Sequence, residues 1–580
     1  MIWIATALAA FPICVGAIKS LLTRRLNAEV LVAIAVIAAA SVGEFIAAGE
    51  VAFIMLLGEE LENYTTRRAR RSLGSLLSLV PAIARVRKGD VEIELPAAAV
   101  KVGDLVVVRP GERIPVDGVV RSGIAAVNQA AVTGESMPVD KHPGDEVYVG
   151  TLADTGALII EATRVGADTT LARIAQLVED AQQHKAPIQR TLDRLATWLV
   201  PVMLTLAALV FVATHDAHRA ITVLIVACPC ALILATPTAV MAGIGRAARA
   251  GILIKGGQHL EAAARLHTIV FDKTGTLTHG QPEVAHVSRF DDHTEAELMQ
   301  MAAVAEKMSA HPVGRAIMRK AESLGIAASD PVTFEAHHGR GVVAEHAGQR
   351  LVVGQRGLMN DNAVAISTAL DEHVEEHHEE GHTTVVVAHD GKICGTICVT
   401  DTVRAHADDS IKQLRQLGIE KIVMLTGDNQ RVAMQIAGAV GVDEVKAEVL
   451  PEQKAQHIES LKAGKRAGGV AMVGDGVNDA PALAVADLGI AMGVTGTDVA
   501  NEAADIALMA DDLSKIAFAV GLSRAALGII KQGLAFALVY NIAMVSLAST
   551  GHLGMIGGAI AHQISSVFVI LNAMRLLRYR

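Results

Sequence analysis

The 580-residue sequence has little charge, few aromatic side chains and few cysteines. Charged residues make up only 19% and hydrophobic residues 51%, a more apolar balance than soluble proteins have, so membrane spans are expected. Aromatic residues make up 3%, the formal net charge is -10, and no stretch concentrates basic residues together with aromatics, so nucleic acid is not an expected partner. Five cysteines are too few for a disulfide framework, so we expect free thiols and soluble parts that face a reducing cytosol.

Apolar runs near the roughly 20 residues that cross a bilayer indicate the membrane topology. We identify seven candidate segments: 1–18, 28–48, 51–61, 192–214, 221–241, 534–550 and 555–571. The first is interpreted as a span rather than a signal peptide, because its basic residues follow it. Clusters of basic residues mark the cytoplasmic side, and these are 19–25, 67–71, 246–249 and 575–580. We therefore expect a multi-pass protein of the cell membrane whose long polar stretches, about 64–190 and 250–525, are cytoplasmic.

Three strand-like apolar runs each end beside an aspartate, and these are Asp272, Asp428 and Asp475. Runs that are apolar on both faces belong to parallel sheets covered by helices, and ligands bind at the carboxyl ends of such strands. Because the three carboxylates would meet at one sheet edge, they predict a site for a hard cation such as Mg2+. Each aspartate alone could instead be a turn residue or a helix cap.

The segment 272–278, which reads Asp-Lys-Thr-Gly-Thr-Leu-Thr, resembles the phosphorylation motif of the P-type ATPases. The resemblance implies that Asp272 attacks the γ-phosphate of ATP and forms an aspartyl phosphate, which agrees with the known chemistry of carboxylate nucleophiles. Lys273 and Lys454 could neutralise the phosphate charge. No Walker A sequence occurs, so a P-loop ATPase is not the alternative.

Two further segments, 426–428 and 474–479, resemble the hinge motifs of the same family. The resemblance implies that Mg2+ is held by Asp272, Thr274 and Asp475. It also implies that the other motif residues orient the nucleotide and its phosphoryl group, and these are Thr426, Gly427, Asp428, Asn478 and Asp479. ATP and Mg2+ are therefore the expected cofactors.

A stretch rich in valine and isoleucine, about 80–163, contains several turn signals and predicts a small β domain. Within it, 133–136 reads Thr-Gly-Glu-Ser and resembles the actuator motif of the P-type ATPases. Alone, these four residues would be an ordinary turn. The resemblance implies that Glu135 positions the water that hydrolyses the aspartyl phosphate, which requires the loop to swing toward Asp272.

The stretch between Asp272 and Asp428 is too long for a connection, so it predicts an inserted nucleotide-binding domain. Residues 309–312 read Ser-Ala-His-Pro and resemble the Ser-Glu-His-Pro motif of the heavy-metal-transporting subclass, with alanine in place of glutamate. His311 alone could simply begin a helix. The resemblance implies that five residues contact the adenine and ribose-phosphate parts of ATP, and these are Glu306, His311, Gly339, Gly341 and Gly354.

Cys228-Pro229-Cys230 lies inside an apolar segment, where the proline opens the helix and can let both thiols meet one ion. Thiolates select Cu+, Zn2+ and similar metals. Either cysteine alone could be a small apolar filler of a membrane helix. The tripeptide resembles the transport signature of the heavy-metal subclass.

The last two apolar segments match that subclass only in part. Tyr540-Asn541 resembles the copper transporters, whereas His562 stands where copper transporters have methionine. Imidazole accepts Zn2+, Cu or Ni2+, although a place at the lipid headgroups would also suit this histidine. Zn2+ is the favoured cargo, with the following expected ligands: Cys228, Cys230 and His562, and more weakly Asn541 and Ser565.

These observations predict a multidomain membrane protein. An α-helical transmembrane bundle carries a small β actuator domain, a Rossmann-like α/β phosphorylation domain of the haloacid dehalogenase type, and an inserted α+β nucleotide-binding domain. The expected boundaries are 1–63, 191–250 and 526–580 for the transmembrane blocks, 64–190 for the actuator domain, 251–284 with 396–525 for the phosphorylation domain, and 285–395 for the nucleotide-binding domain. Members of the family usually have eight spans, so we expect either a late start at Met1 or a reduced first pair.

The favoured function is ATP-driven export of a heavy-metal cation, with Zn2+ or Cd2+ preferred and Cu+ export as the alternative. A membrane-anchored phosphatase with an aspartate nucleophile would explain the three acids but neither 133–136 nor 228–230. A non-catalytic metal receptor would explain only the cysteines. The expected partners are the heavy-metal cation and the lipid bilayer, and no protein partner is predicted.

Overall fold

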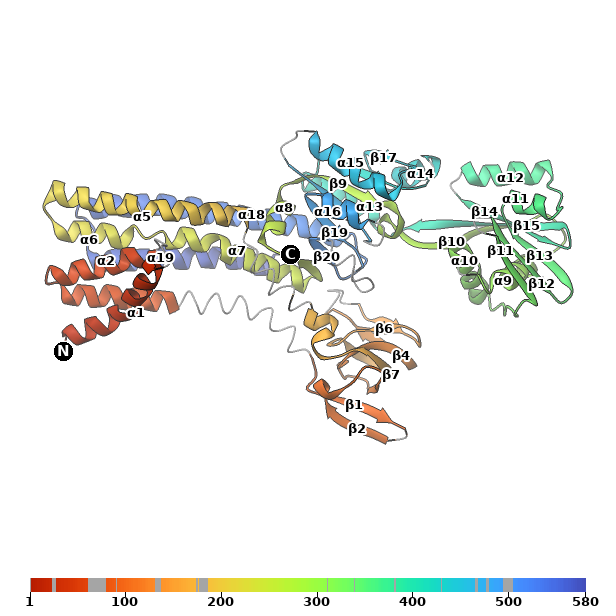
Figure 1. Ribbon diagram of the computed structural model, residues 1–580, viewed down its shortest axis with the longest axis horizontal. Helices are drawn as coiled ribbons and strands as arrows, with labels where there is room; N and C mark the ends of the chain where they lie inside the picture. Colours follow the sequence, from red (N-terminus) through yellow and green to blue (C-terminus); the bar gives the residue numbers. More distant parts are fainter. Residues whose placement is uncertain are drawn as a thin grey trace.

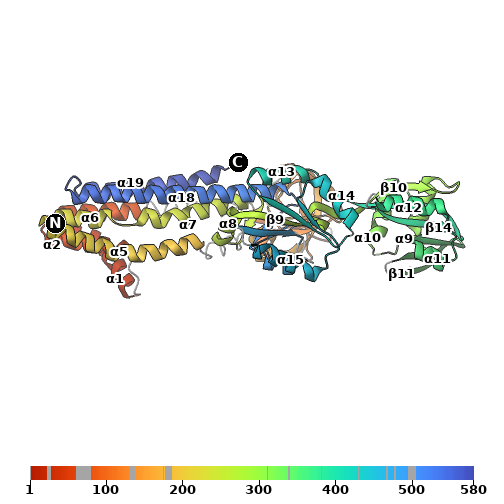
Figure 2. The same ribbon diagram turned by 90° about the horizontal axis from the view of Figure 1, so that it is seen from above.

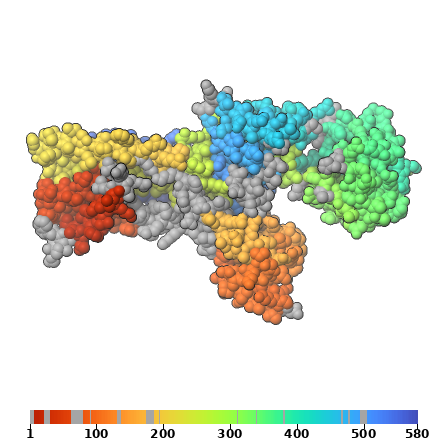
Figure 3. Space-filling view, viewed as in Figure 1, coloured from red at the N-terminus to blue at the C-terminus, as the bar shows by residue number. Residues whose placement is uncertain are grey.

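The computed structural model places a bundle of long helices at one end of the molecule and three sheet-containing bodies toward the other (Figures 1 and 2). A central sheet adjoins the bundle, a second sheet lies beside it, and a third forms the far end. In the space-filling view the second and third bodies are separate lobes (Figure 3). The structure describes residues 2–22, 28–60, 80–89, 91–130, 137–173, 176, 186–309, 311–337, 340–379, 382–428, 430–464, 468–475, 479–493 and 504–579.

Four helical segments are long and apolar enough to cross a bilayer: Pro187–Thr214, Ala217–Arg249, Ser514–Ser549 and Met555–Arg578. The first and third are α5 and α18. The second contains α6 (Ala217–Val226) and α7 (Cys230–Arg249). The fourth contains α19 (Met555–Met574) and the short η4 (Arg575–Arg578).

Helix α18 connects the membrane to the central sheet. Its 36 residues span about 54 Å at 1.5 Å per residue, well beyond the roughly 30 Å of the hydrocarbon core. Its first half belongs to the same buried apolar cluster as the central sheet, and its second half runs along the bundle (Figure 1).

The N-terminal block differs from the predicted topology. It contains α1 (Ile2–Leu22), α2 (Ala28–Ser41) and a further helical stretch at 45–60. The predicted single span 28–48 is wrong, because α2 ends at Ser41 and Gly43 turns the chain with a φ of 95°, which glycine adopts without strain. The apolar helices here, Thr6–Ser20 and Val30–Ser41, are shorter than the four spanning segments.

The central sheet has the strand order β17-β16-β9-β18-β19-β20-β8. Its strands are β8 (Ile252–Ile254), β9 (Leu266–Asp272), β16 (Lys421–Leu425), β17 (Glu444–Lys446), β18 (Gly469–Gly474), β19 (Leu488–Ala491) and β20 (Ile506–Leu508). Neighbouring strands pair in parallel, except that β20 and β8 are antiparallel. The three middle strands β16, β9 and β18 are apolar on both faces because helices cover both faces of the sheet.

Helices cover the two faces of the central sheet in two groups. One face packs against α15 (Pro451–Ala463) and α16 (Ala480–Val485). The other packs against α8 (Gly257–Ala264), α13 (Ala407–Gln416), α14 (Gln430–Val440) and the start of α18. The carboxyl ends of the parallel strands are left open between these layers.

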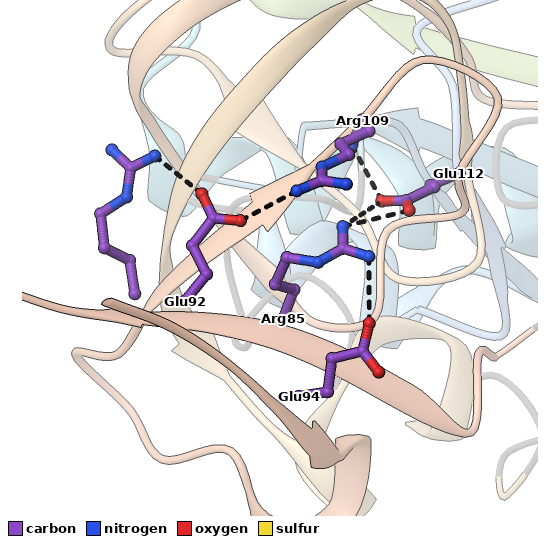
Figure 4. Close-up of polar contacts among 6 residues, drawn as sticks. Arg85, Glu92, Glu94, Arg109 and Glu112 are labelled. Atoms are coloured by element: carbon purple, nitrogen blue, oxygen red, sulfur yellow. Dashed lines mark hydrogen bonds and ion pairs between the residues drawn. The ribbon is translucent and has the colours of Figure 1, made fainter. Parts of the chain in front are cut away.

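The sheet beside it has the order β2-β1-β3-β7-β4-β5, with β6 pairing β4. Its strands are β1 (Ile83–Lys88), β2 (Val91–Pro96), β3 (Leu105–Val108), β4 (Asp117–Asn128), β5 (Val139–Lys141), β6 (Glu146–Val147) and β7 (Leu152–Arg164). A ladder of ion pairs fixes the β1–β2 hairpin against the turn after β3: Arg85 contacts Glu94 and Glu112, and Arg109 contacts Glu92 (Figure 4). Arg85 is 17% exposed and its four companions are 29–61% exposed, so solvent screens each pair and each adds at most about 1 kcal/mol.

The sheet at the far end is antiparallel, with the order β10-β15-β14-β13-β12-β11. Its strands are β10 (Thr278–Arg289), β11 (Thr333–His337), β12 (Gly341–His346), β13 (Gln349–Gly354), β14 (Thr383–His389) and β15 (Lys392–Val403). One face packs against α9 (Glu295–Glu306) and α10 (Pro312–Ser323), and the other against α11 (Arg356–Asp361) and α12 (Thr368–Glu379). The long strands β10 and β15 are the connection to the central sheet (Figure 1).

Candidate functional site

The three predicted aspartates meet at one edge of the central sheet. Asp272 is the last residue of β9 and lies in register with Leu425 at the end of β16, after which Thr426, Gly427 and Asp428 follow. Asp475 directly follows β18, the other neighbour of β9. Parallel pairing therefore brings the ends of all three strands together, as the sequence predicted.

Lys454 bridges the buried carboxylates of this edge. It lies on α15, and its Nζ donates to Asp272 Oδ1 at 2.6 Å and to Asp479 Oδ1 at 2.7 Å. All three side chains are at most 9% exposed. Such a pair of acids around one ammonium is held by charge-assisted hydrogen bonds in a poorly solvated place.

The burial of Asp272 beside other carboxylates shifts its pKa. Burial, together with the negative charges of Asp479 and Asp475, raises the pKa of Asp272 to about 7, although the Lys454 ammonium opposes the rise. Burial opposes the charged form of Lys454, but its two acidic partners outweigh burial and raise its pKa. The carboxylates around Lys454 outnumber its single ammonium, so a further cation can bind at this edge. Carboxylate oxygens are the ligands that Mg2+ prefers.

The loop after Asp272, η3 (Lys273–Leu277), is closely fitted to its surroundings. Lys273 is buried and forms an ion pair with Asp428. Gly275 has a φ of 73°, and a Cβ there would lie 3.1 Å from Asp475 Oδ2, which places that carboxylate directly beside the loop. Thr274 is exposed at the mouth of the edge.

Thr426 and Asp428 are held by the turn that follows β16. Thr426 is buried, and its Oγ1 accepts a hydrogen bond from the backbone N–H of Asp428 at 3.1 Å. Gly427 between them is exposed. The turn presents Thr426 beside Asp272 and directs Asp428 to Lys273, so the predicted motif residues that the structure describes are brought together.

A cleft of about 570 Å³ lies in the far-end sheet on its α9/α10 side. It is lined by four predicted nucleotide contacts, Glu306, His311, Gly341 and Gly354. A Cβ on Gly341 would lie 2.2 Å from Val353 O, and a Cβ on Gly354 would lie 2.3 Å from Arg340 O, so side chains are excluded from this wall. The size suits a nucleotide-sized ligand.

Two polar side chains project at this cleft. The Glu306 carboxyl is 4% exposed, burial raises its pKa, and its Oε2 has no hydrogen-bond partner in the part of the chain that the structure describes. His311 begins α10, where its Nδ1 accepts from the backbone N–H of Val313 at 3.3 Å. An unsatisfied buried oxygen at a cleft wall is an acceptor for an amino group of a ligand.

In the bundle, Cys228, Cys230 and His562 converge. The helix is broken between α6 and α7, so that Cys228 lies in the break and Cys230 begins α7. The ligand atoms of these two residues and of His562 on α19 all lie within 4.8 Å of one another. His562 is 3% exposed, and its Nδ1 has no hydrogen-bond partner among the described residues.

The redox state of Cys228 and Cys230 differs from the prediction. The structure joins Cys228 and Cys230 as a disulfide, whereas the sequence predicted free thiols. The Cα atoms lie 5.6 Å apart, because the break at Pro229 lets two side chains at i and i+2 meet. Metal ligation requires the reduced, deprotonated pair.

The two weaker predicted ligands, Ser565 and Asn541, are not part of the cluster formed by Cys228, Cys230 and His562. Ser565 is buried on α19, and its Oγ donates to the carbonyl oxygen of His562 at 2.7 Å. Asn541 is half-buried on α18, and no hydrogen bond joins it to the cluster among the described residues. Next to it, the Tyr540 hydroxyl donates to Ala561 O at 3.0 Å, which ties α18 to α19 beside His562.

Comparisons with known proteins agree with this arrangement. The P-type ATPase actuator domain family matches residues 78–179, and the haloacid dehalogenase-like hydrolase family matches residues 266–487. A copper-exporting P-type ATPase of Bacillus subtilis is 43% identical over 98% of this chain and 74% of its own length. The chain belongs to the heavy-metal branch of the P-type ATPases.

Other relatives of this P-type ATPase have differing cargoes in their names. A probable cadmium-transporting ATPase of Staphylococcus aureus is 41% identical over 95% of this chain and 70% of its own. A copper-exporting P-type ATPase of Staphylococcus epidermidis is 44% identical over 91% of this chain, which spans 66% of that relative's length. A crystal structure of a zinc-transporting PIB-type ATPase in the E2·Pi state matches with a TM-score of 0.67 and 34% identity over 99% of this chain and 94% of that chain. The predicted family, fold class and membrane location are thereby confirmed.

Three predicted site residues of this P-type ATPase lie outside the described residues: Glu135, Gly339 and Asn478. Two polar residues at the catalytic edge were missed by sequence reasoning, Asp401 and Arg404. Asp401 accepts from Thr278 Oγ1 at 2.6 Å and from the backbone N–H of Gly280 at 3.0 Å. The available signal was a pair of charged residues at the end of β15: Asp401 lies near the end of the strand and Arg404 directly follows Val403.

Arg404 is buried and donates hydrogen bonds to the loop η3 that follows Asp272. Its Nε donates to Thr276 O and its Nη2 to Gly275 O, both at 2.9 Å. Its Nη1 donates to Asp511 O at 3.1 Å. The planar guanidinium thus fixes two successive carbonyls of the loop, which positions Asp272 without contacting it.

Proposed function

We propose that this P-type ATPase exports a heavy-metal cation across the membrane, driven by ATP hydrolysis through an aspartyl phosphate on Asp272. The observation that carries the proposal is the strand-end carboxylate of Asp272, bridged by Lys454 and flanked by the turns that begin at Thr426 and Asp475. Phosphoryl transfer needs positioning and charge neutralisation more than covalent help from the protein, and this edge offers both.

In the first step an oxygen of Asp272 attacks the γ-phosphorus of ATP. The new bond joins this oxygen to phosphorus, the bond from phosphorus to the bridging β,γ-oxygen breaks, and ADP leaves with that electron pair. Lys454 and Lys273 face the incoming negative charge, and Thr426 can donate to a phosphoryl oxygen from the neighbouring strand end. Mg2+, when held by Asp272, Thr274 and Asp475, supplies electrostatic stabilisation of the transferred group. Asn478 and Asp479 are expected to orient the phosphoryl group.

Nucleotide delivery is assigned to the cleft of the far-end domain. Glu306 offers an acceptor to the adenine amino group, while the bare glycine wall at Gly341 and Gly354 admits the ribose and phosphates. His311 and Gly339 are expected to contact the same nucleotide. The domain must approach Asp272 for transfer, and its two-stranded connection through β10 and β15 is the natural hinge.

Hydrolysis of the aspartyl phosphate is assigned to Glu135 of the actuator domain. A glutamate acting as general base takes a proton from water, whose oxygen then attacks phosphorus and releases Asp272. Glu135→Ala is therefore expected to form the phosphoenzyme and retain it, so that trapped phosphate rises while turnover falls. If trapped phosphate also fell, Glu135 would act elsewhere, for example in folding the loop.

The cargo site is assigned to the reduced pair Cys228 and Cys230 together with His562. Two thiolates and one imidazole form a borderline ligand set, which suits Zn2+ or Cd2+ and leaves a coordination position for Asn541 or Ser565. Cu+ is the second candidate, supported by the names of the copper-exporting relatives. The helices α7 and α18 run from this site toward the central sheet, which supports coupling between cargo and phosphorylation (Figure 2).

ATPase activity of the purified chain across Zn2+, Cd2+, Co2+, Mn2+ and Cu+, under reducing conditions, tests the proposal. Cys230→Ala is the blank, and activity equal to the blank with every ion would support a phosphatase, which needs no transported ion. His562→Met should shift stimulation from Zn2+ toward Cu+, because a thioether replaces an imidazole. If the wild type responds to Cu+ alone and His562→Met leaves that response unchanged, His562 is not a ligand and Cu+ is the cargo.

A further inference from the structure

The nucleotide-binding domain carries a second group of metal-ligand side chains, far from the bundle and outside the ATP cleft. Cys398 on β15 is fully buried, His382 immediately precedes β14, and His377 lies on α12. Their ligand atoms, one sulfur and two ring nitrogens, all lie within 4.8 Å of one another. Neither the transport cycle nor the sequence motifs give these residues a role.

Strand register explains why these side chains converge. Cys398 is the cross-strand neighbour of His286 on β10 and of Thr384 on β14, and such neighbours point to the same face of a sheet. Helix α12 packs on that face and brings His377 over the cysteine. The ring of His286 joins the group, with its centroid 5.7 Å from that of His377 and 5.5 Å from that of His382.

The spacing of the two ring nitrogens matches a shared ion. Nδ1 of His377 lies 3.3 Å from Nδ1 of His382. In a tetrahedral zinc site with Zn–N distances of about 2.0 to 2.1 Å, two nitrogens lie roughly 3.3 to 3.4 Å apart. Without a metal, the Nδ1 of one ring donates a hydrogen bond to the Nδ1 of the other. A cation between the rings would instead be bound by the lone pairs of both nitrogens.

The face of the sheet separates this group from the nucleotide. Thr383 and Val385 line the ATP cleft, whereas His382 and Thr384 alternate with them along the chain and point to the opposite side. A cation held by this group would therefore lie across β14 from the bound nucleotide. It would not compete for the cleft.

We propose that His377, His382 and Cys398 form a second metal site, which binds a borderline divalent cation such as Zn2+, with His286 nearest to the fourth position. Imidazole nitrogen and thiolate sulfur are ligands that Zn2+ takes in proteins, and a fourth ligand would complete its tetrahedral coordination. The site lies in the cytosolic domain that binds ATP, and so it would meet the ion on the side from which export begins.

A neighbouring group, His293, His389 and Cys394, also has its ligand atoms within 4.8 Å. There Asp291 accepts hydrogen bonds from the backbone and ring of His293, at 3.0 Å from the backbone nitrogen. Burial, together with Asp291, raises the pKa of the Cys394 thiol to about 12, so the thiolate is strongly disfavoured. This second group is the internal comparison for the test.

The test measures Zn2+ bound to the full chain by equilibrium dialysis with elemental analysis. Cys228→Ser and Cys230→Ser are introduced together to remove the cargo thiolates, and excess Mg2+ occupies the carboxylates of the catalytic edge. Into this background are placed Cys398→Ser and His382→Ala. The matched controls are His378→Ala, an exposed histidine one residue after His377 on α12, and Cys394→Ser. Co2+ absorption of the same proteins reports a metal–thiolate bond directly.

The background should bind about one tightly held Zn2+ per chain and show a Co2+–thiolate charge-transfer band. Cys398→Ser should abolish the band, and His382→Ala should weaken Zn2+ binding at least about tenfold, while His378→Ala and Cys394→Ser keep both signals. ATP binding measured on each variant confirms that the domain is folded. No Zn2+ in the background, or loss of the ion with Cys394→Ser but not with Cys398→Ser, would overturn the proposal. The cargo site and this site fail independently, since the background already lacks the cargo thiolates.

Discussion

The catalytic edge and the cargo site are both polar clusters buried among apolar residues, but they are satisfied to different degrees. At the edge, Lys454 contacts two carboxylates and Arg404 donates to three backbone carbonyls. In the bundle, Nδ1 of His562 and the hydroxyl of Ser566 are buried without a hydrogen-bond partner in the described residues. Asp479 Oδ2 at the edge also has no partner among the described residues, but Asp479 Oδ1 and Asp272 Oδ1 are both paired with Lys454, whereas no ion pair among the described residues involves His562.

This difference indicates which of the two sites gains more stability from a bound ion. An unsatisfied buried polar atom costs about 1 to 3 kcal/mol, so a bundle that retains one gains stability when a cation binds. The catalytic edge already holds opposite charges close together, so removing the Lys454 ammonium there should disturb folding as well as activity. Substitutions in the cargo site should alter metal dependence with little loss of stability.

The largest expected effect follows from Lys454→Ala. Removing the ammonium leaves Asp272 and Asp479 buried together without a counter-charge, and breaking a buried ion pair costs about 3 to 5 kcal/mol. Phosphoenzyme formation should fall at least about a hundredfold, and the protein should unfold at lower temperature. Lys462→Ala is the control, since Lys462 lies on the same helix but only contacts Val485 O and Asp487 near the surface. Equal losses in both variants would contradict the assigned role.

The next effect concerns the loop under the nucleophile. Arg404→Lys keeps the charge but cannot donate to Gly275 O and Thr276 O in one plane, so the loop should lose its position. We expect about a tenfold fall in the rate of phosphoenzyme formation with unchanged ATP affinity, because Arg404 does not line the nucleotide cleft. Single-turnover kinetics separates the two quantities. An increase in the Kd for ATP with a normal rate would show that Arg404 acts on nucleotide binding instead.

A smaller effect concerns pH. The pKa of Asp272 is raised to about 7, so the stability associated with its protonated form is present below its unfolded pKa and is lost as pH rises through about 7. Asp272→Asn should therefore unfold at a higher temperature than wild type at about pH 8. The difference should vanish near pH 4 and shrink when Mg2+ is added. A difference that does not change with pH would contradict the charge crowding at this edge.

The smallest effect is expected at Ser565. Its hydroxyl already donates to His562 O, so Ser565→Ala should change metal-stimulated ATPase activity by less than about twofold. His562→Ala in the same assay should remove most of the stimulation. If Ser565→Ala had the larger effect, the serine rather than the imidazole would be the third ligand.

The sequence predicted what depends on strand composition and missed what depends on tertiary contact. Asp272, Asp428 and Asp475 were placed at one edge because apolar strands such as 268–271 leave no other position for the acid that follows. Arg404 was missed because its partners, the carbonyls of Gly275 and Thr276, are more than a hundred residues away and carry no side-chain signal.

The membrane block illustrates the same limit. The run 28–48 is apolar except for Glu29, Ser41 and Glu44, and the helix ends inside it at Ser41, where the backbone conformation of Gly43 turns the chain. In contrast, the meeting of Cys228 and Cys230 was expected, because a proline between them breaks the helix. Their junction with His562 depends on how α19 packs, which no local pattern contains.

Acid-stable incorporation of the γ-phosphate of ATP into the full chain tests the central claim most directly. It is measured under reducing conditions with and without Zn2+, in wild type, Asp272→Ala and Cys230→Ala. We expect metal-dependent labelling of wild type, no label in Asp272→Ala, and label in Cys230→Ala that no longer responds to Zn2+, Cd2+ or Cu+. Label that persists in Asp272→Ala, or labelling of wild type and Cys230→Ala that responds identically to each metal, would contradict the account.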